Sequence, residues 1–152
     1  MATYLADTNL LLRLADPASS QHLIATEALA QLVGRGDEVF LTPQNFMEFW
    51  AVATRPVAAN GFGWNTERTA REATELQRRF PLLDDSPEIF IRWLALVKEF
   101  AVTGKRVHDA RLVAVLLVHS VEYLITFNLS DFAGFPWVAL VDPRTLAMPS
   151  GN

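Results

Sequence analysis

Short apolar runs alternate along the chain with longer segments whose apolar residues recur at helical spacing. The short runs have the length of buried strands, and they predict strands at Thr3 to Ala6, Val39 to Leu41, Val121 to Thr126 and Val138 to Val141. The longer segments, many of them with Ser, Thr or Asn at the start, predict helices at Leu10 to Leu14, Ser19 to Val33, Thr42 to Thr54, Asn65 to Arg79, Ser86 to a point before Gly104, and Asp109 to His119. We expect Thr8 or Asn9 to cap the first of these helices.

Strands that are apolar throughout and separated by helices are typical of a parallel sheet covered on both faces. We therefore expect an α/β fold with a short, mainly parallel central sheet. No repeat, linker or low-complexity segment divides the sequence, so the whole chain, residues 1–152, is predicted to form one domain. In such open sheets a ligand site lies beyond the carboxyl ends of the strands.

The composition narrows the chemistry available to such a site. The chain has no cysteine, which excludes disulfides, a thiol nucleophile and thiolate metal ligands. Its net charge of −4 argues against binding nucleic acid through overall positive charge, although 11 of its 13 basic residues are Arg, whose planar fork suits phosphate. The longest apolar run, Leu112 to Val118, is too short to span a membrane, and no signal segment is visible, so we expect a soluble, cytoplasmic protein.

Three carboxylates stand in unusual surroundings. Asp7 lies at the junction of a predicted strand and helix, where its desolvation costs several kcal/mol unless a cation or hydrogen-bond donors meet it. Glu48 is the only charged residue of an apolar helical segment that we expect to be buried, so it should face a cleft or a partner; a solvent-facing Glu is the alternative. Asp109 begins the most apolar helix, where an Asp also serves simply as a cap.

Asn128 and Asp131 follow a predicted strand in the stretch FNLSDF, where such residues usually form turns. Asp7 and Asp131 nevertheless each follow a predicted strand, and Asp109 begins the helix that leads into the second of these strands. Carboxylates around one cleft repel each other and raise each other's pKa. A divalent cation bound between them offsets this repulsion. Oxygen ligands without Cys or clustered His suit Mg²⁺ or Mn²⁺, which commonly serve phosphoryl chemistry.

Five stretches of the sequence carry a family resemblance: LADTNLLLRL, NFMEFWAVATRP, NGFG, GKRVHDARLVA and LITFNLSDF. In their order and intervals, and over nearly the whole chain, they resemble the PIN-domain family and, within it, the VapC-like ribonuclease toxins of bacterial toxin–antitoxin pairs. The resemblance implies a three-layer α/β/α sandwich and Mg²⁺- or Mn²⁺-dependent endonuclease activity on RNA. It also implies a VapB-like antitoxin as partner and a homodimer, for which the apolar segments Phe46 to Val52 and Ile89 to Phe100 are candidate contacts.

The resemblance further implies a set of site residues. The family's acidic quartet corresponds to Asp7, Glu48, Asp109 and one residue of the segment from Asn128 to Asp131. Many relatives carry Asp where this chain has Asn128, so Asp131 supplies the fourth carboxylate or that carboxylate is absent. Asp7 and Asp109 are then expected as principal metal ligands, and Glu48 as a ligand directly or through a water. Asp131 is expected to hold a second metal or to orient the attacking water. The positions that support the site by hydrogen bonding are Asn9, Thr126 and Asn128.

Several other residues near these positions have two interpretations. Some basic residues either line a phosphate path or are ordinary surface residues: Arg13, Arg55, Lys105, Arg106 and Arg111. We expect Phe62 and Trp64 to pack or to contact another subunit rather than to stack on bases. His108 adjoins Asp109, but adjacent helical residues point about 100° apart, so a surface or capping role is expected. Asp84 and Asp85 are expected to be solvated loop charges.

Two other functions stay open. In haloacid-dehalogenase-like phosphohydrolases an Asp after the first strand is a covalent nucleophile, as Asp7 would be here, but the second Asp usual in those enzymes is replaced by Asn9. The other alternative is a non-catalytic PIN-like module that binds RNA or protein, for which Asn128 is the support in the sequence.

Overall fold

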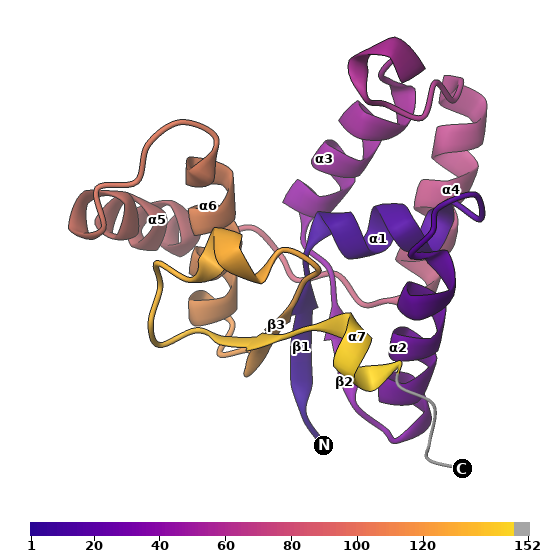
Figure 1. The fold of residues 1–152 in the computed structure, drawn as a ribbon. Helices are drawn as coiled ribbons and strands as arrows, with labels where there is room; N and C mark the ends of the chain where they lie inside the picture. The colour runs from indigo at the N-terminus through magenta and orange to yellow at the C-terminus, as the bar shows by residue number, and fades with distance from the viewer. Residues whose placement is uncertain (148–152) are drawn as a thin grey trace.

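The central sheet is parallel throughout. A computed structural model describes residues 1–147, and in this part of the chain four strands pair in the order β2-β1-β3-β4. The strands are β1 (Thr3–Ala6), β2 (Glu38–Phe40), β3 (Tyr123–Ile125) and β4 (Ala139–Val141). Helices lie on both sides of the sheet (Figure 1), which confirms the three-layer α/β/α architecture.

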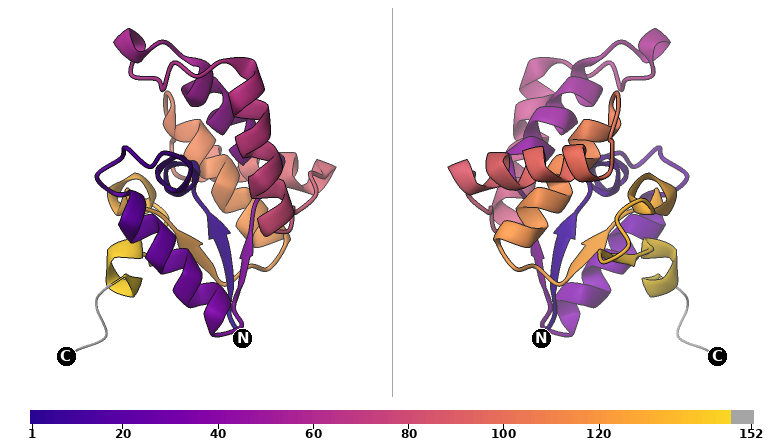
Figure 2. Two further views of the ribbon diagram at one scale, coloured as in Figure 1. Left: turned by 90° about the vertical axis from the view of Figure 1, so that its right-hand side faces the viewer. Right: turned by 90° about the vertical axis from the view of Figure 1, so that its left-hand side faces the viewer.

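The connections between strands are mostly helical. The α-helices are α1 (Thr8–Ala15), α2 (His22–Gly34), α3 (Pro43–Thr54), α4 (Thr66–Arg79), α5 (Pro87–Glu99), α6 (Arg106–Val118) and α7 (Pro143–Leu146). Two 3-10 turns, η1 (Val57–Ala59) and η2 (Leu129–Phe132), lie in the loops. Figure 2 shows α5 and α6 on one side of the sheet and α2 on the other. No helix among residues 1–147 is long and apolar enough to cross a membrane.

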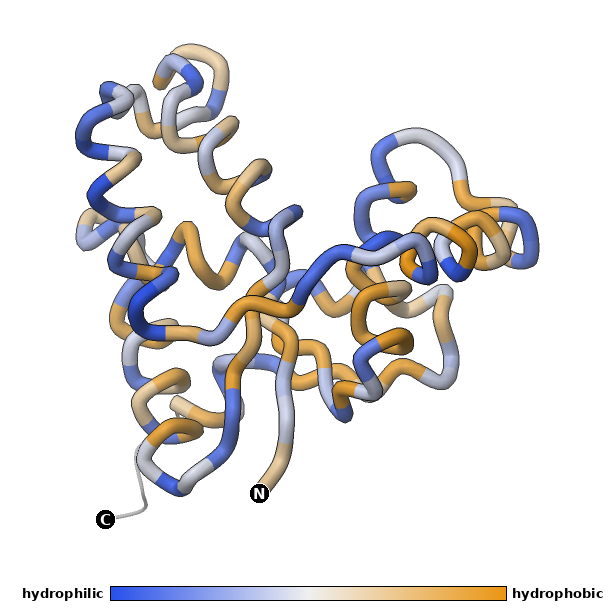
Figure 3. The backbone as a smooth tube through the Cα atoms, turned by 180° about the vertical axis from the view of Figure 1, so that it is seen from behind, coloured by the Kyte–Doolittle hydropathy of each residue, from blue (hydrophilic) through white to orange (hydrophobic). Residues whose placement is uncertain are grey.

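The sheet separates two hydrophobic cores, because successive side chains of a strand point to opposite faces. Tyr4 and Ala6 pack with residues of α1, α2, α3 and α4, whereas Leu5 between them packs with α5, α6 and η2. In Figure 3 the chain is mainly apolar where it crosses the sheet and along α6, and largely hydrophilic along α4. Both faces of the sheet are therefore covered by packed apolar side chains, as the uniformly apolar strands predict.

Some helix ends differ from the predicted ones. Asp7 itself caps α1, since its carboxylate accepts a hydrogen bond from the Thr8 backbone N–H at 2.8 Å, so the expectation of a Thr8 or Asn9 cap was wrong. Helix α6 begins at Arg106, which makes Asp109 its fourth residue rather than its first. Strand β3 is shorter than predicted because the N–H of Val121 bonds back to the Leu116 carbonyl at the end of α6.

The expectation that α3 is buried on all sides was also wrong. Its inner face packs against α1 and α4, and Phe49 is fully buried. Met47 and Trp50, in contrast, are 66% and 39% exposed. Apolar composition alone therefore overstates the burial of this helix, because burial depends on which elements pack against each of its faces.

Candidate functional site

The candidate site lies at the switch point of the sheet, between the neighbouring strands β1 and β3. Strand β1 is paired with β2 on one side and β3 on the other, so the connections that follow β1 and β3 leave the sheet in opposite directions. A crevice forms at such a switch point, outside the carboxyl ends of the strands. Asp7 directly follows β1, and Thr126 directly follows β3.

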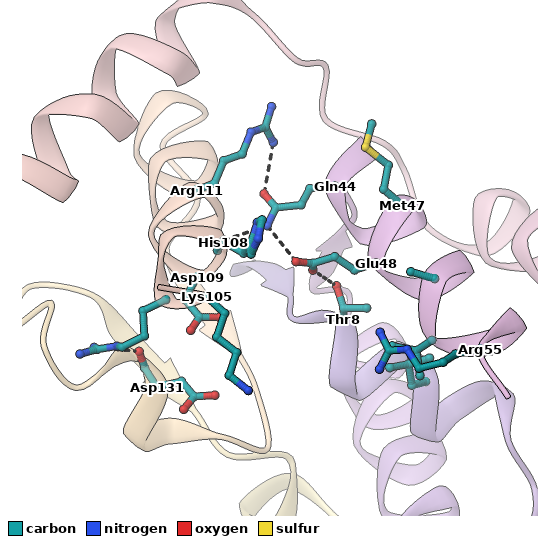
Figure 4. A pocket seen from close by; sticks show the side chains of 14 residues that line it. Thr8, Gln44, Met47, Glu48, Arg55, Lys105, His108, Asp109, Arg111 and Asp131 are labelled. Carbon is teal, nitrogen blue, oxygen red and sulfur yellow. Dashed lines mark hydrogen bonds between the residues drawn. The ribbon is translucent and has the colours of Figure 1, made fainter. Parts of the chain in front are cut away.

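An open cleft of about 780 Å³ occupies this region, with α3 on one side and α6 on the other. Three of the four predicted carboxylates line it: Glu48, Asp109 and Asp131. In Figure 4, Glu48 from α3 and Asp109 from α6 face the space between the two helices, and Asp131 reaches it from η2. Carboxylates that are up to 83 residues apart in the chain thus line the same cleft.

Asp7, the fourth carboxylate, is buried next to this cleft. Only 8% of its surface is exposed, and its neighbour Thr8 lines the cleft. Its two oxygens accept hydrogen bonds from the Thr8 N–H at 2.8 Å and from the Thr126 hydroxyl at 2.7 Å. The pKa of Asp7 is raised to about 6 in spite of these two bonds, mainly by burial and to a smaller extent by the charges of Glu48 and Asp131.

The Thr126 hydroxyl is the centre of a small network that holds Asp7. While it donates to Asp7, it accepts from the Asn9 side-chain amide at 3.3 Å and from the Asn128 backbone N–H at 2.9 Å. The side-chain oxygen of Asn9 in turn accepts from the backbone N–H of Phe127 at 3.3 Å. One hydroxyl thus uses its donor and both acceptor positions, which fixes the direction of its proton toward Asp7.

Glu48 is oriented from two sides. Its carboxylate accepts hydrogen bonds from the Thr8 hydroxyl at 2.7 Å and from the Gln44 side-chain amide at 3.2 Å. The Asn45 side chain donates to the same Thr8 oxygen at 3.0 Å, so the Thr8 proton is left for Glu48. The prediction that Glu48 faces a cleft is borne out by this geometry.

Asp109 has the most strongly perturbed acidity of the site residues. Its pKa is raised to about 7, first by burial and then by the negative charges of the other three carboxylates. The guanidinium of Arg106, one turn earlier on α6, acts in the opposite direction. Carboxylates with shifted pKa values in or beside a cleft are typical of functional sites, because their mutual repulsion does not stabilise the fold.

Gln44 was not singled out from the sequence, although it joins the two walls of the cleft. It is 6% exposed, and besides Glu48 its amide N–H group contacts the His108 carbonyl on α6 at 2.8 Å. Its oxygen accepts from the Arg111 guanidinium at 3.2 Å. The available signal was its position four residues before Glu48, which places both side chains on one helix face.

The basic residues divide into two groups. Four of the five candidates line the cleft: Arg55, Lys105, Arg106 and Arg111. Arg13 is not among the lining residues. Arg111 also forms an ion pair with Asp85 at 3.2 Å, and Asp85 is an exposed loop residue, as predicted. His108 is exposed at the cleft wall, and Phe62 and Trp64 pack at the edge of the first core.

The four acidic side chains in and beside the cleft offer only oxygen, which is the ligand type that hard divalent cations prefer. The pKa values of Asp7 and Asp109 are raised by burial and by the neighbouring carboxylates, and a bound cation would offset both effects. Among residues 1–147, however, no three Asp, Glu or His side chains are close enough together to form a ready-made ligand group. The candidate ligands would therefore have to move closer together to coordinate one ion.

Comparison with known proteins agrees with this geometry. The family model described as "PIN domain" matches residues 4–135. A protein named Ribonuclease VapC24, from Mycobacterium tuberculosis, is 28% identical over 145 residues, which cover 91% of this chain and 95% of the relative.

Solved structures resemble the chain over nearly its whole length. A toxin-antitoxin complex from Klebsiella pneumoniae has a chain that is 26% identical, with a TM-score of 0.63 and coverage of 92% of this chain and 97% of that one. DNA-bound VapBC from Salmonella typhimurium has a chain with a TM-score of 0.71 at 18% identity, covering 94% and 99%. The second likeness shows the fold alone. Because the family model spans most of the chain, from the first strand to the loop beyond Asp131, this protein belongs to the PIN domain family.

Proposed function

We propose that the chain is a Mg²⁺- or Mn²⁺-dependent endoribonuclease, the toxin component of a VapBC-type toxin–antitoxin system, which hydrolyses phosphodiester bonds of RNA. The observation that carries the proposal is that Glu48, Asp109 and Asp131 line one cleft beside the buried Asp7, with basic side chains on the same walls. Burial and the neighbouring carboxylates raise the pKa of both Asp7 and Asp109. The similarity to a protein named Ribonuclease VapC24 supports the reaction class.

Each carboxylate has a proposed role. Asp7 and Asp109 are the principal metal ligands, and Glu48 binds the ion directly or through a water. Asp131 holds a second ion or orients the attacking water. A bound divalent ion supplies an activated water and stabilises the charge of the displaced oxygen.

The chain itself prepares these groups for that role. The hydrogen bonds from Thr126 and Thr8 hold Asp7 and Glu48 in fixed orientations. Deprotonation of Asp7 and Asp109 takes place near pH 6 and pH 7, so cation binding competes with protons in that range.

The basic side chains of the cleft are proposed to bind the RNA backbone. Arg55 lies on the α3 side and Lys105 and Arg106 on the α6 side, so a phosphate in the cleft meets cations from both walls. Such contacts position a nucleic acid without reading its sequence. A local basic rim of this kind is compatible with a net charge of −4.

The proposed assembly includes a VapB-like antitoxin and a homodimer, with residues 1–152 as one domain. VapBC complexes among the structural neighbours support the antitoxin partner. The exposed apolar residues of α3 and α5, such as Met47 and Ile91, are candidates for the dimer contact. Because its substrate is cellular RNA, the protein is proposed to act in the cytoplasm.

The test is cleavage of a mixed tRNA and rRNA pool by the purified, antitoxin-free chain with Mn²⁺ or Mg²⁺. We expect fragments with 5′-phosphate ends that disappear in EDTA and in the Asp109→Asn variant. Asp84→Asn, which removes an exposed carboxylate from outside the cleft, is the matched control and should cut like the wild type. Cleavage that Asp109→Asn and Asp7→Asn both leave unchanged contradicts the proposal.

The non-catalytic alternative has one observation in its favour, which is that the described acidic side chains form no ready-made ligand group. RNA binding without metal uptake or cleavage supports that alternative. The covalent-nucleophile alternative is disfavoured, because Asp7 does not line the cleft and both its oxygens already accept hydrogen bonds. A trapped aspartyl-phosphate would restore it.

A further inference from the structure

A second, smaller pocket of about 340 Å³ adjoins the carboxylate cleft. It is lined by Ser86, Phe90, Trp93, Val107, His108 and Arg111. His108 and Arg111 line both hollows, so the two share a wall on α6. We propose that this pocket holds an unpaired nucleobase of an RNA strand whose phosphates lie in the carboxylate cleft. The inference rests on the proposed function and assigns part of its substrate selectivity to residues outside the acidic site.

The aromatic side of the pocket is exposed and held in place. Phe90 is 59% exposed, and its ring centroid lies 6.0 Å from that of Trp93 at an interplanar angle of 35°. The Trp93 indole N–H donates to the Val107 carbonyl at 2.8 Å, which ties α5 to α6 and fixes the ring. Unpaired bases of single-stranded RNA are commonly bound by stacking on such rings.

The charge of the lining favours a base over a phosphate. Arg111 is the permanent cation of this pocket, and it is already paired with Asp85 at 3.2 Å and bonded to Gln44 at 3.2 Å. A planar, uncharged ring can lie against a guanidinium held in this way, because Arg stacks on aromatic faces. The remaining lining is mainly apolar, which suits a base and not a hydrated anion.

Ser86 adds a polar feature to the pocket. Its hydroxyl is buried and has no hydrogen-bond partner among residues 1–147. Buried polar groups are normally satisfied, so an unpaired hydroxyl in a pocket wall needs an explanation. Ser86 lines the pocket, and rotation of its covered side chain would present the hydroxyl to the edge of a seated base.

The test compares Phe90→Ala with Val33→Ala. The two side chains are 59% and 57% exposed, but Val33 lies on α2 and lines neither the cleft nor the pocket. For cleavage of a short single-stranded oligoribonucleotide with Mn²⁺, we expect Phe90→Ala to raise KM roughly 10-fold, as for loss of one base stack, with kcat unchanged. Val33→Ala should leave KM unchanged. An abasic nucleotide at one position near the cut should raise the wild-type KM and add nothing further in Phe90→Ala.

A second readout separates this inference from the proposed function. Fluorescence anisotropy of the same oligoribonucleotide, measured with the full chain, reports binding even where no cleavage occurs. If the wild type does not cut but Phe90→Ala selectively weakens RNA binding, the proposed function fails and the base pocket stands. If the wild type cuts and both variants have its KM, the nuclease stands and the base pocket is overturned. If Phe90→Ala changes the oligomeric state while KM stays the same, the pocket belongs to a protein interface and the inference is also overturned.

Discussion

The Thr126 hydroxyl donates a 2.7 Å hydrogen bond to the carboxylate of Asp7, and this bond joins the residues that directly follow β3 and β1. The two side chains are 119 residues apart in the chain, yet each depends on the other. Asp7 gains a donor in a site that water hardly reaches, and Thr126 gains an acceptor for its only proton. The bond thus orients the buried carboxylate at the switch point of the sheet.

Replacing Thr126 with Val should both destabilise the protein and impair its activity. The variant keeps the shape of the side chain but removes the partner of one Asp7 oxygen, of the Asn9 side-chain amide N–H and of the Asn128 backbone N–H. The expected cost is about 1–3 kcal/mol in the free energy of unfolding. The pKa of Asp7 should rise above about 6, because the lost bond lowers it. Denaturant unfolding and Mn²⁺-dependent cleavage measure the two effects. Thr126→Ser keeps the hydroxyl and should have close to wild-type stability and cleavage. A Thr126→Val variant with wild-type cleavage at pH 6.5 would show that the activity does not depend on orientation of Asp7 by this bond.

Replacing Gln44 with Leu should lower cleavage about 10- to 100-fold, the range found when a group that orients a metal ligand is lost. Leu keeps the packing of α3 but removes the bond to Glu48 and both bonds to α6. The loss should be greatest at low Mn²⁺ concentration, because a less oriented Glu48 weakens ion binding. Kinetic titration with Mn²⁺ measures this. Gln77→Leu, at an exposed position of α4, is the matched control, and equal Mn²⁺ dependence of the two variants would remove Gln44 from the site.

The sequence predicts the sheet better than it predicts the site. Uniformly apolar strands separated by helices suffice to indicate a covered parallel sheet, and they place Asp7 at a strand end correctly. Local signals could not show that Gln44 bonds to α6, because that contact joins residues 64 positions apart. They also could not show which side of α3 is covered, since Met47 and Phe49 are both apolar but the first is 66% exposed and the second is fully buried.

The apo protein should lose stability as pH rises from about 4 to 7. The pKa values of Asp7 and Asp109 rise from 3.8 to about 6 and about 7, so in this range the folded chain binds more protons than the unfolded chain. The stability is fully present below the unfolded pKa and is lost as pH passes the folded pKa. For Asp7 the shift corresponds to at most about 3 kcal/mol. Denaturant unfolding in EDTA at pH 5 and pH 7.5 measures the difference, which should shrink in Asp7→Asn but not in Asp84→Asn. Added Mn²⁺ should reverse the trend, and a wild-type stability that rises with pH in EDTA would contradict the assignment.

The identity of the fourth carboxylate can be decided between Asp131 and position 128. Asp131 lines the cleft and its charge raises the pKa of both Asp7 and Asp109, whereas Asn128 is exposed and is not among the lining residues. Asp131→Asn should therefore lower the pKa of Asp109 from about 7, move the acid limb of the pH–activity profile to lower pH, and reduce cleavage at saturating Mn²⁺. Cleavage from pH 5 to 8 over a range of Mn²⁺ concentrations measures all three. Adding Asn128→Asp to this variant should not restore activity, because a carboxylate at that position starts outside the cleft. Rescue by the double variant would instead show that the η2 loop turns on metal binding and brings residue 128 into the site, with Asp131 acting only through its charge.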